Sequence, residues 1–199
     1  KAWLAADTKT PLAKEKWSGK VLEISLGGVE ADGGTRSKSI TIGGETAMPF
    51  MEFEGEMRQK GKPWFSFSSE QYNFIQNPSR MFFMKGRIKG LSVWGYHSYR
   101  PPKAKMVIRA LSLLPQFKIE SPEMYPTETV TFLNDLCLFA PGAMTDDRIL
   151  YEELDASRVR ATLALKDLKV SAILYFDQQG DLVNFRSEDR YEVTIMQRL

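Results

Sequence analysis

Residues 64–74 read WFSFSSEQYNF, and this alternating stretch decides the fold class of the chain. Side chains in an extended strand point to opposite faces in turn, so the even-numbered residues would share one face and the odd-numbered residues the other. The turn signals Gly61-Lys62-Pro63 and Asn77-Pro78-Ser79 bound the stretch. The pattern predicts a β-strand of an antiparallel meander.

Similar segments recur on both sides of this strand. They combine β-branched and aromatic residues with short Gly- or Pro-containing turns. The predicted strands are residues 20–26, 39–42, 48–57, 80–88, 91–99, 149–154, 158–165, 170–176, 182–185 and 191–196, while residues 106–114 fit a strand or a helix. We therefore expect a mainly β (α+β) single domain over residues 1–199. It would be a strongly curved antiparallel sheet or half-open β-barrel with a helix covering its concave face.

One segment has a helical period instead. Thr127 can serve as the N-cap, and Glu128 in the first turn suits the helix dipole. Pro141-Gly142 ends the pattern. A helix is thus predicted over Thr127 to Phe139, with one apolar face made of Val130, Leu133, Leu136 and Cys137.

Composition limits the function classes. The chain has 43% hydrophobic and 12% aromatic residues, enough for a core, and 27 basic against 25 acidic residues. Its net charge of +2 creates no general field for nucleic acid or an anionic membrane. Because the chain begins at Lys1 rather than Met, a leader or anchor can precede it. The compartment stays open between bacterial cytoplasm and cell envelope.

Single copies of two reactive residue types exclude several chemistries. Cys137 is the only cysteine, so no intramolecular disulfide can form, and its apolar surroundings predict a buried thiol. His97 is the only histidine, which argues against a His-rich metal site and most His-based catalytic triads. We expect no cofactor and no metal.

A basic stretch between Lys85 and Arg109 contains Trp94, Tyr96 and Tyr99. Cations and aromatics together can bind single-stranded nucleic acid through phosphate contacts and base stacking. We favour the alternative that these cations alternate on a solvated strand face, and we expect no nucleic-acid partner.

Glu52 and Glu54 would share one face of a strand. A pair of carboxylates can act as the acid and base of a glycosidase. An ordinary surface pair explains them as well.

The predicted helix carries three polar residues in an apolar context: Glu128, Asn134 and Asp135. Buried polar groups need partners, and Arg190 or Arg58 could supply one. One reading is a structural salt bridge that fastens the helix to the sheet. The other is a ligand-orienting group at the mouth of an apolar cavity.

Four motifs together resemble a known family: GEMR at residues 55–58, residues 64–72, ETVTFLNDLCLFAPG at residues 128–142, and DRY at residues 189–191. The sequence resembles an uncharacterised bacterial family, the domain of unknown function 6544 type, over residues 48–191, while residues 1–47 form a poorly placed N-terminal part. The resemblance implies no catalytic residue. It implies that the helix motif and the DRY motif act together. The strand-and-helix pattern is similar to half-open barrels that carry lipids or lipoproteins across bacterial envelopes, a fold-level analogy.

The leading functional hypothesis is a non-enzymatic binding module for a lipid or other apolar small molecule, with membrane proximity. The alternatives are a hydrolytic enzyme that uses Glu128, Asp135 and Arg190, and a structural protein-interaction domain. Leu136 would line the space under the helix together with several of the candidate residues. The candidate ligand-binding residues are Trp64, Phe67, Tyr72, Phe82, Met84, Trp94, Glu128, Leu133, Asn134, Asp135, Arg190 and Tyr191.

Overall fold

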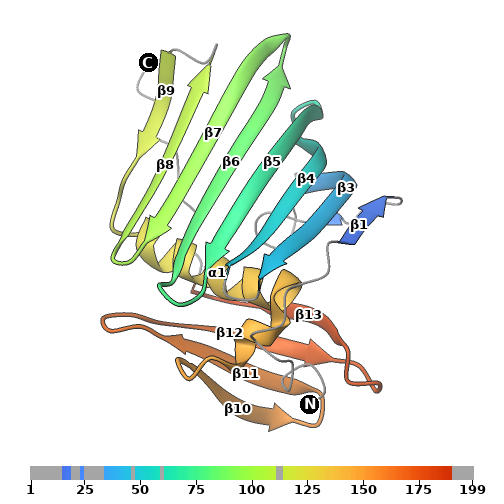
Figure 1. The fold of residues 1–199 in the computed structure, drawn as a ribbon, viewed down its shortest axis with the longest axis vertical. Helices are drawn as coiled ribbons and strands as arrows, with labels where there is room; N and C mark the ends of the chain where they lie inside the picture. Colours follow the sequence, from blue (N-terminus) through green and yellow to red (C-terminus); the bar gives the residue numbers. More distant parts are fainter. Residues whose placement is uncertain are drawn as a thin grey trace.

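The structure is a computed structural model that describes residues 15–18, 23–24, 34–45, 48–58, 61–110 and 114–189. These residues form two antiparallel sheets and one α-helix, α1 (Met124–Phe139), followed by a short 3-10 helix (Pro141–Thr145). In Figure 1 the larger sheet stands above α1 and the smaller sheet lies below it.

The larger sheet is a meander that runs from β3 to β9, with each strand paired to the one that follows it in the chain. Strands β1 and β2 both pair with β3. Short connections between consecutive strands make this arrangement the simplest one for the alternating segments of the sequence. Its strands are β1 (Glu15–Ser18), β2 (Glu23–Ile24), β3 (Gly34–Glu45), β4 (Met48–Arg58), β5 (Phe65–Phe74), β6 (Ser79–Ile88), β7 (Leu91–Arg100), β8 (Lys103–Ala110) and β9 (Leu114–Ile119).

The smaller sheet is a second meander that follows the helix. Its strands pair in the order β10, β11, β12 and β13. They are β10 (Ile149–Asp155), β11 (Arg158–Ala164), β12 (Lys169–Phe176) and β13 (Leu182–Arg186).

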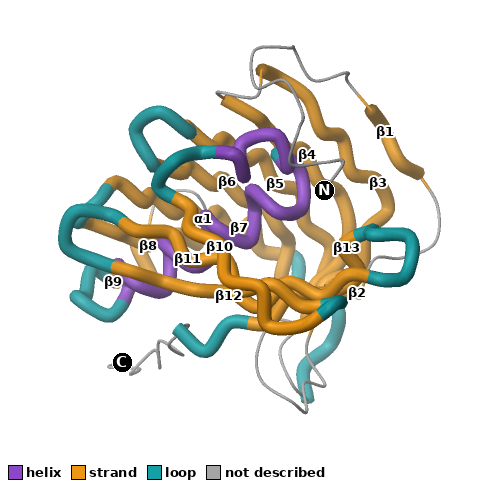
Figure 2. The backbone as a smooth tube through the Cα atoms, turned by 90° about the horizontal axis from the view of Figure 1, so that it is seen from below, coloured by secondary structure: helices purple, strands orange, loops and turns teal. Residues whose placement is uncertain are grey.

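Helix α1 lies between the two sheets in Figure 1, and in Figure 2, seen from below, the smaller sheet and α1 overlap the end of the larger sheet. It packs against β7 and β8 on one side and β12 on the other. The main core joins Tyr99 and Ala104 of the larger sheet to the helix and to the inner face of the smaller sheet. Its fully buried members include Val130, Phe132, Leu133, Leu136, Leu163 and Leu174.

The two faces of the larger sheet have different surroundings. One cross-strand row places Asn73, Arg80, Tyr99 and Ala104 side by side, and all four are buried. We call this side the helix face. The alternate residues lie on the outer face, where the exposed side chains include Met81, Phe83, Lys85 and Trp94.

The predicted fold class is confirmed in its main features. The described residues are mainly strands, the sheets are antiparallel, and there is one α-helix. The described strands form two sheets and no closed barrel. Of residues 106–114, for which the sequence fits a strand or a helix, 106–110 end β8 and Leu114 begins β9, while residues 111–113 lie outside the described residues. The predicted strand at 191–196 lies outside the described residues.

The predicted start of the helix is wrong by one turn. Helix α1 begins at Met124, and the Thr127 hydroxyl donates to the Glu123 carbonyl at 3.0 Å instead of capping the helix. Glu128 therefore lies in the second turn. Pro126 was read as a boundary, yet proline is tolerated in a first turn because the N–H groups there have no intrahelical acceptor.

Candidate functional site

Arg80 of β6 is the centre of a buried polar cluster under α1. Its Nη1 lies 2.9 Å from Oε2 of Glu128, and its Nε lies 2.9 Å from Oδ2 of Asp135. Its Nη2 donates to Oε1 of Gln71 at 2.9 Å. The guanidinium thus joins two strands of the sheet to two turns of the helix. We use the name Arg80 cluster for these four residues and Asn73: Arg80, Gln71, Asn73, Glu128 and Asp135.

Two amides of β5 complete the contacts of the Asp135 carboxylate. Gln71 Nε2 donates to Asp135 Oδ2 at 2.6 Å and to Asn73 Oδ1 at 3.2 Å, and Asn73 Nδ2 donates to the same carboxylate oxygen at 3.5 Å. Gln71 is 2% and Asn73 0% exposed. Buried charges are tolerated when they are paired and hydrogen-bonded. The two Nη atoms of Arg80 meet both conditions, whereas its Nε is close to Asp135 as an ion pair but has no hydrogen-bond partner among the described residues.

Two carboxylates share the single guanidinium of the cluster. Burial raises the pKa of Asp135 above its ordinary value, and the Glu128 carboxylate adds to the rise. Arg80 and the amides of Asn73 and Gln71 oppose it. His97 lies at the more open edge, with its Nδ1 3.7 Å from Oε1 of Glu128. As pH falls, the Asp135 carboxyl therefore takes up a proton before an ordinary exposed aspartate does.

Tyr99 extends the polar contacts between sheet and helix. Its hydroxyl is hydrogen-bonded to the hydroxyl of Thr129 at 2.9 Å, and Tyr99 is only 1% exposed. Burial raises the pKa of Tyr99, so the hydroxyl stays protonated at neutral pH. The ring packs at 5.9 Å from that of Phe132.

The partner predicted for the helix carboxylates is corrected by the structure. Arg80, which the sequence analysis did not name, holds both Glu128 and Asp135. Arg58 instead lies over the Trp64 ring at 4.7 Å. Arg190 and Tyr191 are outside the described residues. The sequence does indicate the position of Arg80. In a strand it alternates with Phe82 and Met84, so it shares the strand face of two residues expected to line the space under the helix.

The other polar residue of the helix does not join this network. Asn134 is 8% exposed, and its Oδ1 has no hydrogen-bond partner in the described part of the chain. Asn134 and Asp135 are adjacent, so they point about 100° apart around the helix axis. Leu133 and Leu136 lie in the main core, with 0% and 1% exposure.

The predicted lining residues divide between the two faces of the larger sheet. Phe67, Phe82 and Met84 lie on the helix face by strand alternation and register. Tyr72 and Trp94 lie on the outer face by the same register, so Trp94 does not line the space under the helix as expected. Strand alternation was visible in the sequence, but the pairing of neighbouring strands decides which alternate set faces the helix.

A second apolar cluster lies on the helix face outside the main core. One cross-strand row carries Phe53, Met84 and Ile108, and the adjacent row carries Phe67 and Val93. We call these five residues the apolar patch. The rings of Phe53 and Phe67 stack with centroids 4.9 Å apart, whereas the other three side chains are half-buried.

Glycine shapes the middle of the apolar patch. Gly95 stands directly across from Met84 on the neighbouring strand. A Cβ atom at Gly95 would come within 3.3 Å of the Met84 side chain. The absence of a side chain at Gly95 lets Met84 lie across the sheet.

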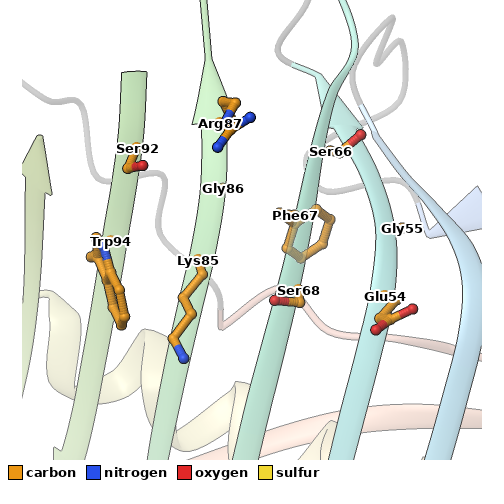
Figure 3. Close-up of a pocket in the computed structure, with 10 residues that line it drawn as sticks. All are labelled: Glu54, Gly55, Ser66, Phe67, Ser68, Lys85, Gly86, Arg87, Ser92 and Trp94. Carbon is orange, nitrogen blue, oxygen red and sulfur yellow. The ribbon is translucent and has the colours of Figure 1, made fainter. Parts of the chain in front are cut away.

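An open hollow of about 450 Å³ lies on the outer face between β4 and β7 (Figure 3). The Lys85 ammonium sits over the Trp94 ring at 4.7 Å. The outer-face side chains around it are serines with charged residues and one aromatic residue: Glu54, Ser66, Ser68, Lys85, Arg87, Ser92 and Trp94. Gly55, Phe67 and Gly86 also border the hollow, but they belong to the alternate set of positions that faces the helix. Among the described side chains, no group of three or more His, Cys, Asp or Glu could hold a metal ion.

Comparison with known proteins places the chain in a family. A family of unknown function (DUF6544) matches residues 43–197. The chain belongs to this family. The match includes β4 to β13, α1 and every residue of the Arg80 cluster. Membership in this family assigns no activity to the cluster.

One curated protein shows local similarity. The acetyl-CoA decarbonylase/synthase complex subunit delta of Archaeoglobus fulgidus is 46% identical over 41 residues, which is 21% of this chain and 9% of that protein. The chain thus spans less than a tenth of that protein's length. No solved structure matches the chain. None of the described helices is long and apolar enough to cross a membrane.

Proposed function

We propose that this protein is a non-enzymatic binding module for an apolar, lipid-like molecule, and that the ligand lies on the apolar patch. One observation carries the proposal: apolar side chains also lie on the helix face in the part of the larger sheet that α1 does not cover. Phe53 and Phe67 are buried outside the main core around α1, and Met84, Val93 and Ile108 beside them are half-buried, so these three side chains leave part of the patch accessible.

The chemistry of the patch fits an acyl chain. Ligand sites for apolar molecules are lined by aliphatic and aromatic side chains with a few polar groups beside them. Met84 is flexible and adapts to irregular apolar shapes. Ser69, in the same row as Phe53 and Met84, supplies a hydroxyl beside the patch.

The arrangement of the charged groups favours a binding module over a hydrolytic enzyme. A catalytic acid or base must reach a substrate. In the Arg80 cluster, Glu128 and Asp135 are buried and bound to Arg80, and Asp135 also accepts from Gln71. The cluster is suited to fastening α1 to the sheet.

Titration with a fluorescent fatty acid, 11-(dansylamino)undecanoic acid, tests the proposal. Met84→Lys would place a charge in the patch, and Met81→Lys would make the same change on the outer face of the same strand. We expect Met84→Lys to weaken binding about tenfold or more, the equivalent of about two buried methylene groups. Met81→Lys should leave the dissociation constant within about twofold.

The two variants must first show the same thermal midpoint within a few degrees, so that a loss of binding reflects the patch. Native mass spectrometry of the purified wild-type protein would add a direct search for a co-purified apolar molecule. Absence of saturable probe binding to the wild type, or equal weakening by both variants, would contradict the proposal.

A further inference from the structure

The outer face of the larger sheet carries two strips of opposite charge. One cross-strand row runs through Glu54, Ser68, Lys85, Trp94 and Arg109. Its acidic end lies on β4 and its basic residues lie on β6 and β8. Further glutamates and basic residues lie on the same face in the neighbouring cross-strand rows. The acidic strip consists of Glu52, Glu54, Glu56 and Glu70, and the basic strip of Lys85, Arg87, Lys105 and Arg109.

The two strips do not neutralise each other within one copy of the chain. Glu54 and Lys85 are two strands apart, a separation of about 10 Å between backbones. Among the described residues, no ion pair joins the acidic strip to the basic strip. The charges are therefore available to a partner with the complementary arrangement.

Large apolar side chains are exposed at the same place. Met81 is 42%, Phe83 40% and Trp94 41% exposed. Phe83 packs against Tyr96 with ring centroids 5.1 Å apart, so the aromatic surface is continuous across β6 and β7. Exposed aromatics and methionines with charged residues around them are typical of a protein–protein interface.

We propose that a second copy of this chain covers the outer face and forms a two-fold symmetric dimer. The axis would lie in the interface, parallel to the strands, between β5 and β6. Rotation about that axis places the acidic strand β4 of each copy over β7 of the other, between the basic residues of β6 and β8, and a symmetric interface gains this contact twice. An axis across the strands would place like charges together.

The size and shape of the face agree with this partner. Strands β4 to β8, about 4.8 Å apart and about ten residues long, cover about 800 Å². That area is what each partner contributes to a typical stable interface. The hollow lined by Ser66, Ser68 and Lys85 is centred on β5 and β6, the position of the proposed axis, and provides room for the partner's long side chains.

Charge reversal gives a direct test. Glu52→Lys/Glu54→Lys cancels the net charge of the acidic strip and leaves the outer face basic, and Lys85→Glu/Arg109→Glu cancels the net charge of the basic strip and leaves the outer face acidic. We expect each double variant alone to dimerise at least about tenfold more weakly than the wild type in sedimentation equilibrium at low salt. A 1:1 mixture should form the heterodimer in native mass spectrometry, because an acidic face then meets a basic face.

Lys166→Glu/Lys169→Glu is the matched control, since it changes charge by the same amount at two exposed positions of the smaller sheet, in the β11–β12 turn and at the start of β12. It should dimerise like the wild type. A wild-type chain that is monomeric at about 100 µM in low salt would overturn the proposal, as would a dimer that both face variants leave unchanged. Binding of single-stranded DNA or of phosphatidylglycerol vesicles by a monomeric wild type, lost in Lys85→Glu/Arg109→Glu, would assign the face to that partner instead.

Discussion

Arg80 of β6 and Asp135 of α1 form an ion pair of 2.9 Å between the larger sheet and the helix. The same guanidinium contacts Glu128, which lies about two helical turns before Asp135 on α1, also at 2.9 Å. Because all three residues are at most 9% exposed, the pairing fixes which face of the helix meets the sheet. An arginine on the helix face of β6 thus sets the orientation of α1.

Arg80→Met should destabilise the fold by about 3–5 kcal/mol, because it leaves two carboxylates buried without a counter-charge. Urea unfolding measures the loss. Arg186→Met changes an exposed arginine of the smaller sheet, away from both faces of the larger sheet, and it should stay within about 0.5 kcal/mol of the wild type. Equal effects of the two substitutions would show that the Arg80 pairs contribute nothing.

Asp135→Asn should flatten the acidic part of the stability profile. Burial raises the pKa of Asp135 above its ordinary 3.8. Between the ordinary and raised values the folded chain binds more protons than the unfolded chain, so the free energy of unfolding falls as pH rises. Asp135→Asn removes this contribution.

Unfolding free energies measured at several acidic pH values test this sign. The other ionisable groups at the cluster, Arg80, Glu128 and His97, remain in both proteins, so only the difference between the two profiles reports Asp135. Glu153→Gln, which removes an exposed carboxylate, is the control and should leave the profile unchanged. A steeper fall with pH in Asp135→Asn would contradict the assignment.

Gly44→Ala should cost more stability than Gly180→Ala. Both glycines have positive φ, 94° and 88°, so each alanine is strained by about 1–2 kcal/mol. A Cβ at Gly44 would also lie 2.5 Å from the Met48 carbonyl oxygen, whereas a Cβ at Gly180 meets nothing within 4 Å. Thermal unfolding of the two variants measures the difference, and an equal loss would refute the backbone clash.

Cys137 should react with a thiol reagent such as DTNB only when the chain opens. It is 6% exposed, and burial raises the pKa of its thiol to about 12. The signal has a single source because this is the only cysteine. We expect the reaction rate at pH 8 to rise with urea in parallel with unfolding. Complete labelling within seconds in native buffer would contradict a buried thiol.

The sequence predicts the strands well, since alternation and turn residues are local signals. Residues 64–74 and 80–88 fall within a residue or two of β5 and β6. The helix is also local, although its first turn was missed because Pro126 resembles a boundary. The prediction that the 199 residues form one domain stays a prediction.

The candidate site is less predictable, because its geometry depends on contacts between distant segments. Glu128 and Asp135 stood out as polar residues in an apolar helix, but the choice among arginines depends on strand register. Register also decides that Trp94 faces outward and Phe82 inward. Neither the apolar patch nor the two charged strips has a signature in one contiguous stretch.

The position of α1 between two sheets has a consequence for the order of folding. All described strands of the larger sheet precede the helix in the chain, and those of the smaller sheet follow it. During synthesis, the lower part of the helix face therefore emerges with Arg80, Gln71 and Asn73 lacking their helical partners. In ribosome-bound nascent chains that expose only residues before Met124, these polar side chains would remain uncovered on the sheet surface. They would find their partners only after Glu128 and Asp135 have left the exit tunnel.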